Sequence, residues 1–230
     1  MIKKTLFFLL ILVLFSFKSD TVITPEILIG KSSAIQPLLK GERIKLQTEV
    51  YDALQKMIKA AKKDGVHIML VSGYRSFNHQ KRIWNRKFDK YRKQGYSVKK
   101  CIEKITNYTA IPGTSRHHWG TDVDLSDKYA NGLNNNKREK FNQWMTKNAK
   151  KFGFYLVYTN DKHRTGYKYE SWHFTYKKLA KPLLEKYLKT DVFDLIKQQG
   201  IKGSYTFTEV FFKDYVKNYV LGINPELLKN

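Results

Sequence analysis

The residues best suited to chemistry lie in a ten-residue stretch, Ser115 to Asp124, which reads Ser-Arg-His-His-Trp-Gly-Thr-Asp-Val-Asp. The stretch holds two imidazoles and two carboxylates around one glycine, and both kinds of group bind divalent metals. A downstream segment, Glu170-Ser171-Trp172-His173, adds a third imidazole and a spare carboxylate. Three protein ligands leave the fourth position of a tetrahedral zinc site open for water, whose pKa the metal lowers toward ~7. The two segments therefore predict a hydrolytic metal site with one unligated carboxylate as a base.

Three separated motifs resemble the zinc D-alanyl-D-alanine carboxypeptidase family, which includes the vancomycin-resistance D,D-peptidases. Together they span roughly residues 46–176 and occur in the order that the family uses, which is far more specific than one isolated signature. The motifs are Ser72-Gly73-Tyr74-Arg75-Ser76 with Gln80 beyond it, Ser115-x-His117-x-x-Gly120-x-x-x-Asp124, and Glu170-x-x-His173.

The resemblance implies that Zn2+ is held by His117, Asp124 and His173. Adjacent side chains on extended backbone point apart, so His117 and His118 are not expected to share one metal. His118 is then a packing or substrate-side residue, with a ligand role as the alternative. The family usually has a small residue where Asp122 stands, and Asp122 could instead accept a hydrogen bond that orients a ligand histidine.

The resemblance also implies that Glu170 is the catalytic base, which takes a proton from the attacking water and returns it to the leaving amine. Arg75, Gln80 and Ser115 stand where the family binds substrate. A guanidinium binds a carboxylate bidentately, as a carboxypeptidase needs for the free end of its substrate. Ser115 has a second interpretation, because a serine that caps the turn would look the same in sequence.

The activity that the resemblance implies is removal of a terminal D-alanine from peptidoglycan stem peptides. An L,D-carboxypeptidase or a peptidoglycan endopeptidase is the related alternative. A non-catalytic, zinc-stabilised binding domain is an alternative of a different class. The presence of both Glu170 and Arg75 argues against that last alternative, since a pure binding module needs neither.

The resemblance implies an α+β fold with a small central antiparallel sheet flanked by helices, followed by a C-terminal helical extension. Periodicity agrees, because apolar residues recur at helical spacing in several segments and short apolar runs separate them. The predicted helices cover about residues 50–61, 80–91, 97–107, 141–152, 179–188 and 210–220. The predicted strands cover residues 66–71, 121–125, 154–158 and 172–176. The run at residues 66–71 is nearly all apolar and is predicted to be a buried strand.

At 230 residues, the chain is long enough for one full domain with a proper core. We divide it into a signal peptide or N-terminal anchor (1–18), a lead-in segment (19–45), the zinc peptidase-like catalytic domain (46–177) and the helical extension (178–230). The basic start and short apolar run of the first segment predict export to the periplasm or another extracytoplasmic site, with membrane anchoring if the segment stays uncleaved. The single cysteine, Cys101, is expected to be a buried thiol.

The formal net charge of +23 favours anionic partners. Besides the stem peptides, these could be anionic wall polymers or a membrane surface. Nucleic acid is not expected, because the lysines are spread along the chain without a recognised nucleic-acid-binding module. A solvated, lysine-rich surface is the alternative interpretation of the same charge, and the sequence does not predict an oligomeric state.

Overall fold

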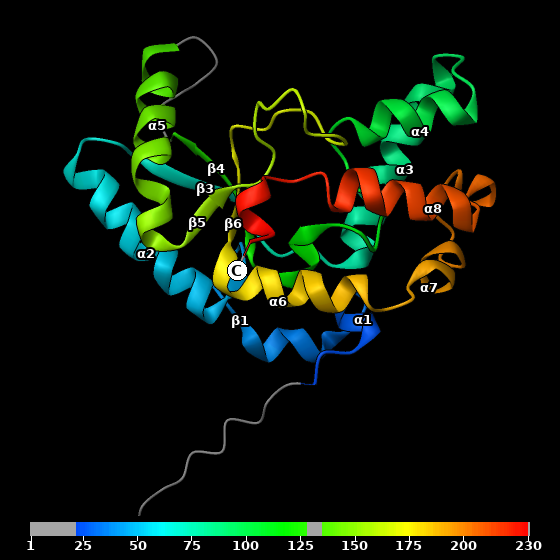
Figure 1. Ribbon diagram of the computed structural model, residues 1–230, viewed down its shortest axis with the longest axis horizontal. Coiled ribbons are helices and arrows are strands. Elements are labelled where there is room, and N and C mark those ends of the chain that lie inside the picture. Colours follow the sequence, from blue (N-terminus) through cyan, green and yellow to red (C-terminus); the bar gives the residue numbers. More distant parts are fainter. Residues whose placement is uncertain (1–21, 128–134, 230) are drawn as a thin grey trace, which may run out of the picture.

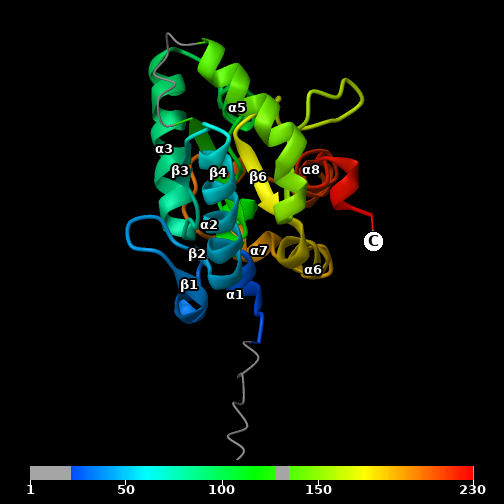
Figure 2. The ribbon, with the colours of Figure 1, turned by 90° about the vertical axis from the view of Figure 1, so that its left-hand side faces the viewer.

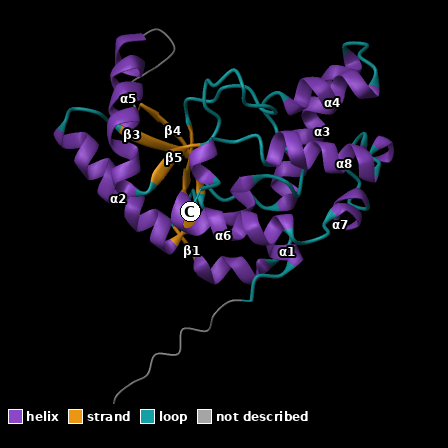
Figure 3. Ribbon diagram, in the orientation of Figure 1, coloured by secondary structure: helices purple, strands orange, loops and turns teal. Residues whose placement is uncertain are grey.

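A four-stranded antiparallel sheet in the order β3-β4-β6-β5 lies at the centre of the computed structural model, and helices pack around it (Figures 1 and 3). The structure describes residues 22–127 and 135–229, so the predicted signal or anchor segment lies outside the described residues. Within those two ranges, no helix is both long enough and apolar enough to cross a membrane. The predicted α+β class with a small antiparallel sheet is confirmed. The strands are β3 (Ile68–Ser72), β4 (Asp122–Asp127), β5 (Phe154–Leu156) and β6 (His173–Tyr176), and a separate pair joins β1 (Leu39–Lys40) to β2 (Leu46–Gln47).

One face of the central sheet is apolar and packs beneath α2 (Thr48–Lys63) and α5 (Asn135–Asn148), which lie on the same side of the molecule in Figure 1 and face the viewer in Figure 2. Successive side chains of a strand point to opposite faces. In β4, Val123 and Leu125 therefore enter the core beneath these helices, whereas Asp122 and Asp124 point to the other face. That second face carries the polar cavity described below.

A second core lies among the remaining helices. Trp84 of α3 and Trp119 are buried there, and the C-terminal helices add Leu184, Phe212 and Tyr215 to the same cluster. The aromatic residues of the C-terminal segment therefore pack into a core, as their helical spacing predicted. The helices are α1 (Pro25–Leu28), α3 (Phe77–Lys93), α4 (Val98–Thr106), α6 (Lys177–Leu188), α7 (Phe193–Lys197) and α8 (Glu209–Tyr215), which continues as a π-helical turn over Val216–Val220.

Three details of the sequence-based prediction were wrong. The run that ends in β3 is not fully buried, because Met69 and Val71 are 41% and 52% exposed. The strand lies at the edge of the sheet and has only one face covered by helices. The prediction from its apolar run therefore overestimated its burial. The strand predicted over residues 154–158 ends at Leu156, and α7 was not predicted.

Candidate active site

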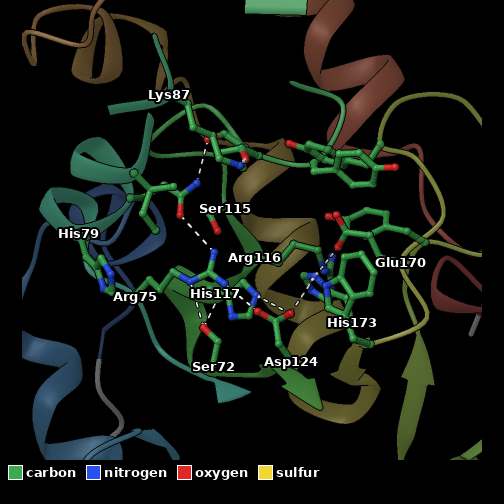
Figure 4. Close-up of a pocket in the computed structure, with 18 residues that line it drawn as sticks. Ser72, Arg75, His79, Lys87, Ser115, Arg116, His117, Asp124, Glu170 and His173 are labelled. Atoms are coloured by element: carbon green, nitrogen blue, oxygen red, sulfur yellow. Dashed lines mark hydrogen bonds and ion pairs between the residues drawn. The ribbon is translucent and has the colours of Figure 1, made fainter. Parts of the chain in front are cut away.

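A polar cavity of about 330 Å³ opens on the second face of the sheet. Its lining includes all of the residues that the sequence singled out for metal binding, proton transfer and substrate binding, and Figure 4 shows most of them converging on it. They come from positions as far apart as residues 75 and 173, so the fold rather than local sequence brings them together. The seven residues are Arg75, Gln80, Ser115, His117, Asp124, Glu170 and His173.

The register of the sheet aligns the polar residues of three neighbouring strands. Asp124 of β4 pairs directly with His173 of β6, so their side chains lie on the same face. On the other side of β4, the register shifts between Leu70 and Ser72 of β3. This irregularity moves Ser72 opposite Asp124, whereas Leu70 still pairs with a core residue. Ser72, Asp124 and His173 thus form a polar row across the sheet.

His117 reaches the row from a 3-10 turn, Arg116–Trp119, that precedes β4. The turn ends at Gly120, whose φ of 67° is in the left-handed region that favours glycine. A Cβ atom at Gly120 would also lie only 2.9 Å from Leu39 Cδ2. His117 Nδ1 contacts the Gly73 carbonyl oxygen at 2.8 Å, which leaves Nε2 facing Asp124.

His118 points away from the polar row. Its Nε2 accepts a hydrogen bond from the Gly113 amide at 3.0 Å, and its Nδ1 donates to the Arg75 carbonyl at 2.6 Å. Burial lowers the pKa of His118 to about 3, so the ring is neutral. His118 is therefore a packing residue that ties together the loops on either side of the cavity. The two histidines separate because they lie on a 3-10 turn and not, as predicted, on extended backbone.

Three atoms, contributed by His117, Asp124 and His173, are placed to hold a tetrahedral metal ion, and these three side chains are called the metal-binding row below. His117 Nε2 and His173 Nδ1 lie 3.4 and 3.6 Å from Asp124 Oδ1, and the three ligand atoms are all within 4.8 Å of one another. Ligand atoms ~2.1 Å from a tetrahedral zinc ion are ~3.4 Å apart. Asp124 Oδ1 is also buried without a hydrogen-bond partner, which is the state of an oxygen atom that a cation would satisfy. The residues present therefore fit zinc.

His173 lies between two further carboxylates. Its Nε2 contacts Asp122 Oδ2 at 2.8 Å, and its Nδ1 lies 3.3 Å from Glu170 Oε2. Burial by itself would lower the pKa of His173, but the hydrogen bonds to Asp122 and Glu170 outweigh burial and raise it to about 9. Glu170 lies in the turn just before β6, so it can reach the same point as His173 although the two residues are three apart.

Asp122 is held in a fully buried network. It accepts hydrogen bonds from Arg116 Nε at 2.9 Å, from the Thr175 hydroxyl at 2.6 Å and from the Thr121 hydroxyl at 3.0 Å. Burial would raise the pKa of Asp122, but Arg116 and His173 together keep it far below its usual range. Asp122 is thus a fixed anion that presents the Nδ1 side of His173 to Asp124. This is the orienting geometry that the sequence offered as its alternative for Asp122.

Changing Asp122 to asparagine is expected to lower the affinity for Zn2+ roughly 10- to 100-fold, the usual effect of losing a group that orients a metal ligand. An amide no longer provides an anion for His173 and Arg116 to face. Competition with a chelating dye, on protein whose folding is checked by circular dichroism, measures this affinity. An unchanged dissociation constant in the folded variant would contradict the orienting role.

Arg75 contacts the metal-binding row directly. Its Nη2 lies 2.7 Å from Asp124 Oδ2 and 3.0 Å from the Ser72 hydroxyl, which also accepts from Nε. Nη1 donates to Gln80 Oε1 at 3.3 Å. A guanidinium has five N–H groups, so these four hydrogen bonds leave one for a ligand. In this arrangement Arg75 cannot by itself form a bidentate clamp.

Gln80 and Ser115 complete this wall of the cavity. Gln80 is buried, and its amide nitrogen donates to the Ala110 carbonyl at 2.9 Å. The amide is therefore fixed between the Ala110 loop and Arg75. The Ser115 side chain makes no capping hydrogen bond to the turn that it precedes, so the capping interpretation is wrong. Ser115 instead lines the cavity with its hydroxyl group.

Several cavity residues were missed by sequence analysis. Tyr158 is buried with its ring edge against His173, at a centroid distance of 4.9 Å. Tyr167 and Lys87 also line the cavity. Only Lys87 had a usable signal, because it lies seven residues after Gln80 and therefore on the same face of a helix. The tyrosines resembled ordinary core residues.

The C-terminal helices support the loop that carries Ser115. The hydroxyl of Tyr215 in α8 accepts a hydrogen bond from the Ile111 amide at 3.1 Å and lies 3.2 Å from Thr114 Oγ1. It also hydrogen-bonds to the hydroxyl of Tyr167. These buried contacts connect α8 to the turn that delivers the metal-binding stretch.

Comparison with known sequences shows several relatives. A family model for VanY, described as D-alanyl-D-alanine carboxypeptidase, matches residues 43–179. A D-alanyl-D-alanine carboxypeptidase of Enterococcus faecalis is 34% identical over 143 residues, which cover 62% of this chain and 51% of the relative. The putative carboxypeptidase YodJ of Bacillus subtilis is 37% identical over 144 residues, covering 59% and 48%. The chain thus spans about half the length of these two curated relatives.

Three solved structures have a similar fold. VanYB in complex with D-alanine-D-alanine has a TM-score of 0.54 and 28% identity, over 66% of this chain and 88% of that chain. The LdcB LD-carboxypeptidase has a TM-score of 0.50 and 34% identity, over 65% and 72%. A mutant of the D,D-pentapeptidase VanY in complex with Zn(II) has a TM-score of 0.53 and 28% identity, over 65% and 88%.

Proposed function

Because the chain belongs to the VanY family of D-alanyl-D-alanine carboxypeptidases, we propose that it is a zinc peptidase that removes the terminal D-alanine from peptidoglycan stem peptides. The observation that carries this proposal is the grouping of His117, Asp124 and His173 around one buried, unsatisfied carboxylate oxygen, with Glu170 beside them. A site built only to bind zinc for stability needs no further carboxylate at this position.

His117, Asp124 and His173 would hold Zn2+. When bound, zinc polarises a carbonyl group and lowers the pKa of water, which is the chemistry that peptide hydrolysis needs. The protein contributes the geometry. The Gly73 carbonyl and Asp122 each occupy one nitrogen of a ligand histidine, so the other nitrogen of each ring faces Asp124.

Glu170 is the proposed base. Its Oε2 lies 3.3 Å from His173 Nδ1 and therefore beside the metal-binding row without belonging to it. From this position the carboxylate can take a proton from the attacking water and pass it to the nitrogen atom of the leaving D-alanine. Tyr158 closes the same corner with its ring against His173, which limits access of bulk water.

Arg75, Gln80 and Ser115 are the proposed substrate-binding residues. Arg75 contacts Asp124 through Nη2 and Gln80 through Nη1, so one N–H group of Nη1 remains for a substrate oxygen. Gln80 holds the guanidinium in place from the other side. Ser115 adds a hydroxyl that can donate to the carboxylate of the residue to be released.

Peptidoglycan is extracytoplasmic, so we expect this activity to operate outside the cytoplasm. The net charge of +23 suits an environment of anionic polymers and headgroups. Contact with such surfaces is part of the proposal and would be measured by sedimentation of the protein with purified cell walls.

The function is tested by incubating the zinc-loaded full chain with muropeptides that end in D-Ala-D-Ala and reading the products by mass spectrometry, with and without a chelator. The expected result is that the muropeptides lose one alanine and that the chelator prevents this loss.

L,D-carboxypeptidase activity is the second candidate, because of the likeness to the LdcB LD-carboxypeptidase. Tetrapeptide stems, which end in a single D-alanine after an L-centre, test it directly. Release of a larger fragment would indicate an endopeptidase, and no cleavage of any stem would contradict the enzyme proposal.

A further inference from the structure

Lys87 is a half-buried cation that the proposed chemistry does not use. It lies on α3, and its side chain lines the cavity together with Gln80 and Ile83 of the same helix. Residues three and seven positions apart lie on one face of a helix, so α3 forms a continuous wall from Gln80 to Lys87. Figure 4 shows Lys87 and Asp124 at opposite ends of the view, with Ser115 between them.

Among the described residues, Arg75 and Arg116 of the cavity have carboxylate partners, whereas Lys87 has none. Arg75 pairs with Asp124 at 2.7 Å, and Arg116 pairs with Asp122 at 2.9 Å. In the described part of the chain, the Lys87 ammonium hydrogen-bonds to the neutral hydroxyl of Thr109 and forms no salt bridge. Burial lowers the pKa of Lys87, although the charge of Glu170 favours the protonated form.

An ammonium group that is partly removed from water is unfavourable without an anion beside it. Its position in an open cavity suggests that the anion comes from a ligand. The contacts also show which part of the cavity it serves. Gln80 binds the Ala110 carbonyl, and Thr109, next to Ala110, binds Lys87. The ammonium therefore lies on the Gln80 side of the cavity.

That side is where the residue to be released must lie. The attacked carbonyl has to lie at the metal-binding row, and Ser115 and Gln80 line the wall beyond it. The released residue ends in a carboxylate. Arg75 has one N–H group left for it, which is too few for bidentate binding. Ser115 can donate a hydrogen bond to that carboxylate but carries no charge, and the charge of Arg75 already faces Asp124, so another cation is needed to neutralise it.

We propose that the Lys87 ammonium binds the free C-terminal carboxylate of the residue to be released and thereby makes the site select chain ends over internal peptide bonds. This inference rests on the proposed function and deepens it, because it assigns the exopeptidase specificity to a residue outside the three family motifs. Lys87 thus determines specificity and takes no part in proton transfer.

The test compares a peptide ending in D-Ala-D-Ala with the same peptide carrying a C-terminal carboxamide. In the zinc-loaded full chain, Lys87→Met is expected to lower kcat/KM for the acid roughly 10- to 100-fold, mainly through KM, and to change the rate on the carboxamide little. A 10- to 100-fold decrease in kcat/KM is the size expected when a hydrogen bond between charged groups is lost. Lys90→Met removes the same charge one turn further along α3, where the side chain is exposed, and is expected to change neither rate by more than twofold.

Lys87→Arg keeps the charge and should keep most of the preference for the acid. Equal losses on acid and carboxamide in Lys87→Met, or no loss on either, would overturn the inference. Calorimetric binding of D-Ala-D-Ala and its carboxamide gives a second measurement that needs no turnover. If the enzyme proposal fails and no peptide is cleaved, weaker binding of the acid by Lys87→Met still supports the carboxylate site. Equal binding of the acid by the wild type and the variant would reject it.

Discussion

Changing Glu170 to glutamine is expected to lower kcat for stem-peptide hydrolysis roughly 10²- to 10⁴-fold while leaving bound Zn2+ in place, which is the usual range for loss of a general base. Glutamine is nearly the same size as glutamate and keeps a hydrogen-bonding group next to His173, but it cannot accept a proton. Single-turnover rates, with zinc measured in the same samples by mass spectrometry, test both halves of this expectation.

Asp122→Asn is the matched control, because Asp122 and Glu170 contact the two nitrogen atoms of the same ring, at 2.8 and 3.3 Å. The two substitutions should have opposite effects. Asp122→Asn should weaken zinc binding and leave measurable turnover when zinc is saturating, whereas Glu170→Gln should retain zinc and lose turnover. Hydrolysis at the wild-type rate by purified Glu170→Gln protein would remove Glu170 from the mechanism, and loss of zinc would make it a ligand.

Replacing His117 with alanine is expected to weaken zinc binding more than 100-fold, beyond the range for a group that only orients a ligand. The same substitution at His118 should leave zinc binding intact and instead lower the free energy of unfolding by about 2–5 kcal/mol. The reason is that the Gly113 amide and the Arg75 carbonyl, both bonded to His118, would lose their partner. Each buried polar group left unpaired costs ~1–3 kcal/mol.

Chemical denaturation of the metal-free variants separates these effects from metal binding. His117→Ala should unfold closer to the wild-type midpoint than His118→Ala, because it leaves one buried group without its partner, the Gly73 carbonyl, whereas His118→Ala leaves two. The assignment of the two neighbours is wrong if His118→Ala loses zinc while remaining as stable as the wild type.

The main elements of the fold could be predicted because each depends on local sequence. Apolar residues at helical spacing predicted α2, and Gly65, whose φ is in the left-handed region, follows the end of this helix. The helix predicted over residues 97–107 has a serine at its start, and the Ser97 side chain accepts a hydrogen bond from the Lys100 amide at the beginning of α4. Cys101 is buried in that helix, as its apolar neighbours predicted. Exposure of β3 could not be predicted in this way, because it depends on which strand occupies the edge of the sheet.

By itself, the sequence determined which kinds of group the site contains and how the motifs are ordered, since residue type and spacing are properties of the chain. Only the tertiary structure decided which atoms meet. The pairing of Asp124 with His173 depends on a register between strands that are almost fifty residues apart. The divergence of His117 and His118 depends on a 3-10 turn whose carbonyl and amide partners come from other loops. In the described part of the chain, the Lys87 ammonium has no carboxylate partner for the same reason, because salt-bridge partners are set by distances in space and not by positions along the chain.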